Sequence, residues 1–140
     1  MGNTSKVEKC QRSSNMSELI WKTPAPSSGF LRGVSLQIRP KREVALTLEF
    51  EGENEEMHCA ELSFAGVVQY RTTYMAALQA EKIHQAYDRL IELPGSPELQ
   101  EVIQATEANG NGVAYRHFRI CFDDGPCFDF ICASFIPTVE

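Results

Sequence analysis

The sequence predicts a single α+β domain with a mainly antiparallel sheet of five or six strands and one or two short helices. Alternating apolar runs near both ends of the chain support this class, because a period of two is typical of strands with one buried face. A capped helical segment begins between them, at Ser96. The 140 residues suffice for one domain, which we place at 18–140, whereas the polar, aperiodic residues 1–17 predict a flexible tail.

The first β pattern covers residues 31–50. Two apolar runs flank the basic turn Arg39-Pro40-Lys41-Arg42, and the second run alternates strictly at Val44, Leu46, Leu48 and Phe50. A third run at 60–68 keeps the same period after the acidic turn 51–56. Because these connections are too short for parallel crossovers, the three strands are predicted to form a meander.

The middle of the chain predicts a helix over 74–83, capped by Thr72 or Thr73, because most of its residues are fair to good helix formers. Periodicity alone does not decide whether this helix continues to Leu93. We favour a strand at 87–92.

A second helix is predicted to begin after Ser96. Ser96 is a favourable N-cap, Pro97 suits the first turn, and Glu98 faces the positive end of the helix dipole. The run Asn109-Gly110-Asn111-Gly112 is predicted to end the helix.

The last thirty or so residues give the second strong β pattern, with strands at 113–122 and 127–135 around the turn Asp123-Asp124-Gly125-Pro126. Alternation places Arg116, Phe118, Ile120 and Phe122 on one face of the first strand, and Tyr115, His117, Arg119 and Cys121 on the other. Since both faces mix polar and apolar residues, the hairpin is predicted to be partly covered on both sides or to meet a partner. Arg116 and Arg119 are predicted to pair with Asp or Glu on neighbouring strands.

The five cysteines form an odd set without a CxxC pair, and four of them fall in predicted strands. This pattern favours small buried apolar residues in a reducing compartment over a disulfide framework. No run approaches the roughly 20 apolar residues of a membrane span, and the N-terminus lacks the apolar run of a secretory signal. These observations predict a cytoplasmic protein that does not enter the membrane.

The net charge of −6 is unevenly distributed. Residues 1–50 hold eight Lys/Arg and four Asp/Glu, whereas residues 51–140 hold five and fifteen. An acidic body argues against nucleic acid, whose phosphates need a basic face. It suits a basic protein partner drawn by long-range attraction.

Established catalytic motifs are missing from the sequence. There is no phosphate-binding loop or Gly-x-Ser-x-Gly elbow, and the acidic turn lacks EF-hand spacing. His58 and Cys59 are adjacent, so on a strand they point to opposite faces. Cross-strand pairs of His117 with Cys127 or Cys132 stay open. We therefore predict no catalytic residue, no cofactor and no metal site, and interpret Asp123, Asp124 and Asp129 as turn chemistry.

Four segments carry a family resemblance: Gly66-Val67-Val68-Gln69-Tyr70-Arg71, Tyr87-Asp88-Arg89-Leu90-Ile91-Glu92, Ser96-Pro97-Glu98-Leu99 and the strand from Tyr115 to Asp124. Together they resemble a pattern in small uncharacterised bacterial single-domain proteins, some of them similar to immunity proteins of toxin systems. The resemblance spans roughly residues 30–136, implies a strand at 87–92 and implies no enzyme activity.

The leading hypothesis is a non-enzymatic protein-binding domain, similar to an immunity protein, that uses an acidic surface against a basic partner. Its candidate contact residues are the acidic turn and the mixed basic-aromatic strand: Glu51, Glu53, Glu55, Glu56, Tyr115, His117 and Arg119. The alternative is a small-molecule-binding or enzymatic domain with a pocket between sheet and helix, favoured where His58, His84 or His117 converges with Cys or Asp. A homodimer formed through exposed sheet edges is a third hypothesis.

Overall fold

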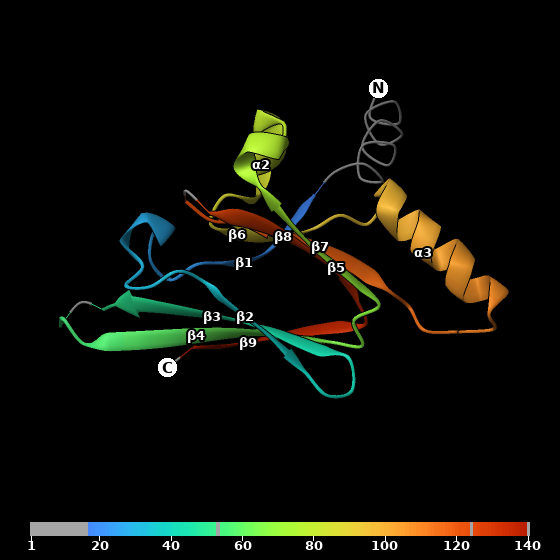
Figure 1. Ribbon diagram of the computed structural model, residues 1–140, viewed down its shortest axis with the longest axis horizontal. Helices are drawn as coiled ribbons and strands as arrows, with labels where there is room; N and C mark the ends of the chain where they lie inside the picture. Colours follow the sequence, from blue (N-terminus) through green and yellow to red (C-terminus); the bar gives the residue numbers. More distant parts are fainter. Residues whose placement is uncertain (1–16, 53, 124, 140) are drawn as a thin grey trace, which may run out of the picture.

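The computed structural model describes residues 17–52, 54–123 and 125–139. Over these residues, nine strands form two antiparallel sheets that pack face to face, and two α-helices lie on the outer side of one sheet (Figure 1). The α+β class and the antiparallel pairing are confirmed. The second sheet is an addition to the single sheet that the sequence predicted.

The five-stranded sheet carries both helices and has the strand order β1-β6-β7-β8-β5. Its strands are β1 (Glu18–Lys22), β5 (Gln69–Tyr74), β6 (Arg89–Glu92), β7 (Arg116–Cys121) and β8 (Pro126–Cys132). β6 confirms the strand expected at 87–92, and β7 with β8 confirms the last hairpin.

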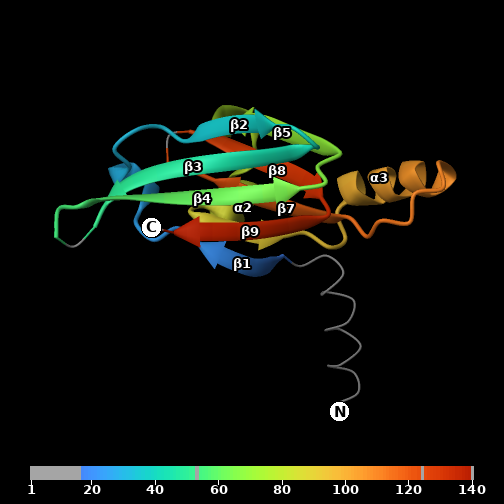
Figure 2. The same ribbon diagram turned by 90° about the horizontal axis from the view of Figure 1, so that it is seen from below.

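The four-stranded sheet has the order β2-β3-β4-β9. Its strands are β2 (Ser35–Arg39), β3 (Glu43–Glu51), β4 (Met57–Ala65) and β9 (Ser134–Val139). The first three confirm the predicted meander. Figure 2 shows this sheet in front of the five-stranded one, with α3 extending beyond one end of the two sheets.

The main core fills the space between the sheets. Alternate residues of β3 and β4 face alternate residues of β7 and β8, so one face of each strand is buried. Phe64 of β4 lies at the centre, its ring stacked on Phe130 with centroids 3.9 Å apart and tilted against Phe118 at 6.1 Å. Phe118, which alternation placed on one face of the last hairpin, thus helps to join the two sheets.

The helices are α2 (Ala80–Ala86) and α3 (Pro97–Ala108), with short 3₁₀ turns at Ser27–Gly29 and Met75–Ala77. The predicted cap of α3 is confirmed, because Ser96 Oγ accepts a hydrogen bond from the Leu99 N–H at 3.1 Å. The helix ends at Ala108 with Asn109 as its C-cap, as the Asn-Gly repeat predicted.

The helix predicted over 74–83 begins later than expected. Thr72 and Thr73 do not cap it, since they belong to β5, where they pair with Phe128 and Cys127 of β8. β-Branched residues suit a pleated strand, and pairing with β8 outweighs the helix propensity of the neighbouring sequence. The helix that forms, α2, begins at Ala80.

The last predicted strand divides into two. β8 ends at Cys132 and β9 begins at Ser134, so the chain crosses from one sheet to the other at Ala133. The Ala133 N–H donates to the Ala65 carbonyl at 2.9 Å, which fixes the crossing against the end of β4. One continuous segment therefore contributes to both sheets.

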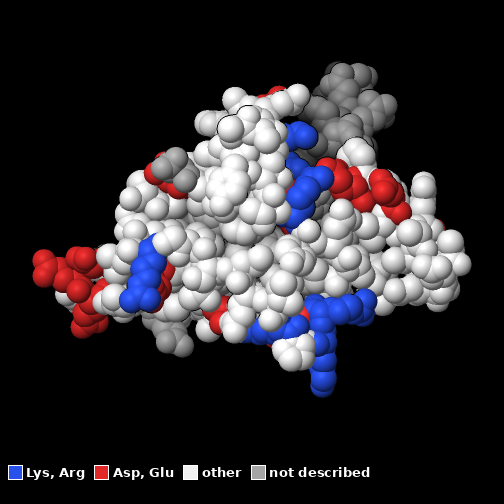
Figure 3. Space-filling model, viewed as in Figure 1, with Lys and Arg blue, Asp and Glu red and all other residues white. Residues whose placement is uncertain are grey.

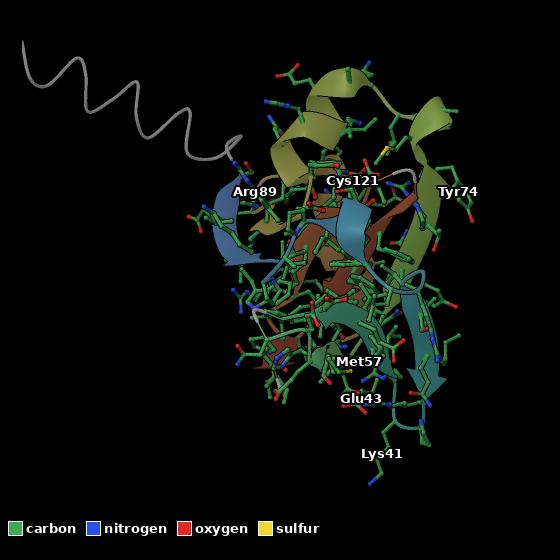
Figure 4. The ribbon with its side chains drawn as sticks, turned by 90° about the vertical axis from the view of Figure 1, so that its left-hand side faces the viewer. Lys41, Glu43, Met57, Tyr74, Arg89 and Cys121 are labelled. Atoms are coloured by element: carbon green, nitrogen blue, oxygen red, sulfur yellow. A yellow bond between two sulfur atoms is a disulfide. The ribbon has the colours of Figure 1, made fainter. Side chains whose placement is uncertain are left out.

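The interpretation of the cysteines as unlinked residues is wrong for one pair. Cys121 and Cys127 face each other in the register of β7 and β8, with Cα atoms 4.0 Å apart, and form a buried disulfide. Figure 4 shows Cys121 on the side of the sheet beneath α2. The sequence separation of 6 spans a tight hairpin, and its register brings the two side chains together.

None of the helices in the described part of the chain is long and apolar enough to cross a membrane. The compartment stays a prediction. The tail predicted at 1–17 lies outside the described residues up to 16, as do Glu53 and Asp124.

Candidate functional site

A row of charged side chains crosses the outer face of the five-stranded sheet between the two helices. Arg119 of β7 pairs in register with Asp129 of β8, and Asp129 pairs with Arg71 of β5. Apolar clusters lie on either side of this row, one beneath α2 and the other beneath α3. The charged side chains therefore lie on the strip of the sheet between the two apolar clusters that α2 and α3 cover.

His117 joins this row to the start of α3. Its Nε2 lies 2.7 Å from Asp129 Oδ1, and its Nδ1 lies 2.6 Å from Ser96 Oγ, while its side chain is fully buried. Ser96 Oγ accepts the Leu99 N–H and is also hydrogen-bonded to Nδ1 of the imidazole. An ionised carboxylate only accepts hydrogen bonds, so Nε2 carries a proton and donates it to Asp129. Ser96, His117 and Asp129 form a continuous hydrogen-bonded relay.

Asp129 is the centre of the cluster. Its Oδ1 accepts from His117 and also from Arg119 Nε at 2.9 Å, although only 7% of the side chain is exposed. Burial raises the pKa of this carboxyl, but the hydrogen bond from His117 and the charge of Arg119 outweigh burial and lower the pKa overall. Asp129 is therefore ionised at neutral pH.

Arg71 and Glu98 connect the same cluster to the first turn of α3. Arg71 Nη2 donates to Glu98 Oε2 at 3.2 Å and lies 3.9 Å from Asp129 Oδ2. Burial raises the pKa of Glu98, but hydrogen bonds from its own backbone N–H and from Arg71 lower it overall. The N-terminus of α3 is thus held to the sheet through Ser96 and through Glu98.

A pocket of about 310 Å³ opens between α2 and the start of α3. Arg119 and Ser96 contribute to its wall, together with polar side chains that include Gln79, Lys82 and Gln85 of the α2 region. Figure 3 shows Lys and Arg atoms in the hollow between the helices, beside the acidic residues of α3. The pocket therefore reaches the relay from outside.

The residues predicted to contact a partner fall into two separate places. Tyr115, His117 and Arg119 are all buried on the outer face of the five-stranded sheet, between it and the helices. The hydroxyl of Tyr115 accepts a hydrogen bond from Asn111 Nδ2 at 2.9 Å, and its ring packs beneath α3. A macromolecular partner does not reach these three side chains directly; the pocket is the route to Arg119.

The acidic turn lies at the end of the β3–β4 hairpin. Glu51, Glu55 and Glu56 are exposed there, and Glu53 lies outside the described residues. Figure 3 shows the acidic atoms gathered at the end of the molecule opposite α3. The two predicted sets therefore do not form one surface.

The three histidines separate in the same way. His58 lies on β4, its ring stacked on Phe50 with centroids 5.8 Å apart, and His84 is exposed on α2. His117 meets a carboxylate, which is the convergence named for the small-molecule alternative. It meets neither Cys127 nor Cys132, because Cys127 is in the disulfide and Cys132 faces the core between the sheets.

Sequence reasoning identified His117 and Arg119 but missed the groups that complete the cluster. Ser96 was predicted only as a cap and Asp129 only as turn chemistry. Asp129 shares a face with His117 through the register of β7 against β8, which no local pattern specifies, and Ser96 reaches His117 through the placement of α3. The available signal was the presence of three ionisable or polar side chains, His117, Arg119 and Asp129, on strands joined by one tight turn.

No family model, curated protein or solved structure matches this chain. Among the residues that the structure describes, no group of three or more His, Cys, Asp and Glu side chains is arranged to hold a metal ion.

The arrangement offers two kinds of chemistry. Arg119 presents a planar, permanently charged group to a pocket, which suits a carboxylate or phosphate. Ser96 Oγ lies 2.6 Å from an imidazole nitrogen whose ring is held by a carboxylate, which is the spacing found around an activated hydroxyl.

Proposed function

We propose that this chain is a small-molecule-binding domain that holds a ligand with a carboxylate or phosphate group in the pocket between α2 and α3. The supporting observation is Arg119, which lines the pocket although only 5% of the residue is exposed. Asp129 compensates the charge of this buried guanidinium, which nevertheless borders the pocket.

The guanidinium has hydrogen-bonding capacity left for a ligand. Its Nε donates to Asp129 Oδ1, and among the described residues that is the bond that holds it. Arginine carries five N–H donors, and the terminal pair is the fork that binds carboxylate or phosphate oxygens. Because Asp129 fixes the Nε end, the orientation of this fork is set before the ligand arrives.

Lys82 adds a second cation to the same pocket, and Gln79 and Gln85 add amide groups that can donate or accept. Two carboxylates, Glu81 and Glu98, also line the pocket, and Glu98 is paired with Arg71. At about 310 Å³ the pocket is at the lower end of the range for small-molecule sites. A small organic acid or a phosphate monoester suits these dimensions, whereas a folded protein surface does not.

The test is a titration of the ¹⁵N-labelled chain, followed by NMR, with a panel of mono- and dicarboxylates and phosphate monoesters. Neutral alcohols and amides of matched size serve as control ligands. We expect saturable shifts confined to the amides of 79–85, 93–98 and 119 for at least one anionic compound. Lys82→Ala is expected to weaken that binding about 10-fold, since a hydrogen bond to a charged group contributes roughly 1.5 kcal/mol or more.

Arg89→Ala is the matched control, because Arg89 is an exposed cation on β6 that does not line this pocket. It should leave the affinity unchanged. If no anion gives saturable shifts, or if Arg89→Ala weakens binding as much as Lys82→Ala does, the pocket is not the binding site.

The exposed acidic turn supports a second candidate, the basic protein partner of the leading sequence hypothesis. The tip of the β3–β4 hairpin carries three exposed acidic residues, Glu51, Glu55 and Glu56. A partner drawn to this turn would be lost as salt is raised. A pull-down at low and high salt with a Glu51→Gln/Glu55→Gln/Glu56→Gln variant tests it, and retention of the same partner by that variant would exclude the turn.

A further inference from the structure

We propose that Ser96 is a nucleophile activated by His117, so that the pocket hydrolyses small esters that carry an anionic group. This inference rests on the proposed function for its substrate class. It adds a covalent step at a group that the ligand-binding proposal does not need.

The relay has the spacing that a general base requires. Ser96 Oγ lies 2.6 Å from His117 Nδ1, and His117 Nε2 lies 2.7 Å from Asp129 Oδ1. In the proposed reaction Nδ1 accepts the proton of the serine hydroxyl. Asp129 is ionised, so it stabilises the imidazolium that forms when the serine proton is transferred. Here Nδ1 faces the serine and Nε2 faces the carboxylate, and either imidazole nitrogen can act as the base.

Ser96 also has the exposure and surroundings of a nucleophile. It is half-buried and lines the pocket, in contrast to the fully buried His117 behind it. One lone pair of Oγ takes the Leu99 N–H, which leaves a second lone pair for attack. The Leu99 N–H and the positive end of the twelve-residue helix α3 both stabilise negative charge that develops on Oγ.

The reaction balances with water as the only co-reactant. Ser96 Oγ attacks the carbonyl carbon of the ester, and its proton moves to His117 Nδ1. The tetrahedral intermediate collapses, the C–O bond of the ester breaks, and the departing alcohol takes the proton from His117. Water then attacks the acyl-serine with the same proton route and releases the acid. Arg119 and Lys82, in the same pocket, hold the anionic group of the substrate.

The test uses diisopropyl fluorophosphate, which labels activated serines, on the full chain, with the adduct located by mass spectrometry. We expect one adduct, on Ser96, and none on Ser35 or Ser134, which are exposed serines without a histidine partner among the described residues. Hydrolysis of p-nitrophenyl acetate measured in parallel should be lost in Ser96→Ala.

His117→Asn and His117→Gln separate activation from folding. Each amide can keep one of the two hydrogen bonds of the imidazole but cannot act as a base. Circular dichroism identifies which variant folds, and the folded variant should label at least about 100-fold more slowly, as expected when a general base is removed. If the folded variant labels at the wild-type rate, His117 is not the base.

If wild-type Ser96 acquires no adduct, Ser96 is a helix cap alone and the inference is overturned. That outcome is distinct from failure of the proposed function, because anion binding is measured by NMR without any reaction at Ser96.

Discussion

Replacing Asp129 with asparagine removes one buried negative charge and keeps the shape of the side chain. The carboxylate is 7% exposed and accepts from His117 Nε2 at 2.7 Å and from Arg119 Nε at 2.9 Å. Asparagine can still accept a hydrogen bond through its Oδ1. What the substitution removes is the charge that compensates Arg119, whose side chain is 6% exposed.

The expected cost follows from that burial. Removing one partner of a buried ion pair typically costs about 3–5 kcal/mol, because the remaining charge stays buried without compensation. Glu61→Gln is the matched control: Glu61 also bonds an arginine, at 2.7 Å from Arg39, but the two side chains are 36% and 28% exposed. An exposed pair of this kind contributes about 0–1 kcal/mol. Asp129→Asn should therefore destabilise the chain by at least about 2 kcal/mol more than Glu61→Gln does.

The assay is equilibrium unfolding in urea at pH 7, followed by the fluorescence of Trp21, the single tryptophan, and by circular dichroism. Adding Arg119→Met to Asp129→Asn removes the stranded cation, and we expect it to recover about 1 kcal/mol or more as coupling energy. If Asp129→Asn costs no more than Glu61→Gln, or if the effects of the two cluster substitutions simply add, Asp129 does not compensate a buried charge on Arg119.

Two substitutions test the packing that positions this site. Phe64→Ala removes the ring stacked on Phe130 at the centre of the core, so its free energy of unfolding should fall by about 3–5 kcal/mol in the same assay. Gly66→Ala places a Cβ at φ +65°, 2.9 Å from Ala133 Cβ, whereas Gly110→Ala has a similar φ of +76° and no neighbouring atom within 4 Å. Because of overpacking, Gly66→Ala should therefore lower the free energy of unfolding by at least about 1 kcal/mol more than Gly110→Ala does. Equal losses would mean that Ala133 can move to accommodate the added methyl group.

Local signals in the sequence were sufficient for the elements around the site. Alternation placed Phe118 on the opposite face of β7 from His117 and Arg119, and the structure buries it in the main core. Arg116 and Arg119 do pair with acids of neighbouring strands, since Arg116 Nη2 lies 2.7 Å from Glu92 Oε1 and Arg119 Nε lies 2.9 Å from Asp129. The facing of Phe118 depends only on spacing within one strand, and the pairing of the arginines follows from the cost of an unpaired buried charge, so both predictions are confirmed.

The cluster itself needed information that local patterns do not contain. The disulfide between Cys121 and Cys127 and the pairing of Arg119 with Asp129 share one hairpin register, and a slip of one residue would send one partner of each pair to the other face. Ser96 was recognisable as a cap, but its second partner, His117, lies 21 residues away on a strand. The two-sheet arrangement was missed for a related reason, because the division of the last strand at Ala133 depends on tertiary packing.

The acid sensitivity of the chain should report the same cluster. The pKa of Asp129 is lower in the folded chain than in the unfolded chain, where an Asp titrates near 3.9. Its stabilising contribution is therefore fully present above that value and is lost as the pH falls through the lower, folded pKa. The groups facing it are His117, Arg119 and Arg71, and the pKa of Glu98 is lowered as well.

The measurement is urea unfolding from pH 6 to pH 2, in which the free energy of unfolding should fall as the pH falls. In Asp129→Asn the slope of that fall should be smaller by up to about 1.4 kcal/mol per pH unit, which corresponds to one proton. Glu61→Gln removes a more exposed carboxyl whose pKa is also lowered, chiefly by its bond to Arg39, and should flatten it less. An equal or smaller change for Asp129→Asn would mean that the buried carboxylate is not the dominant acid-labile group of the pair.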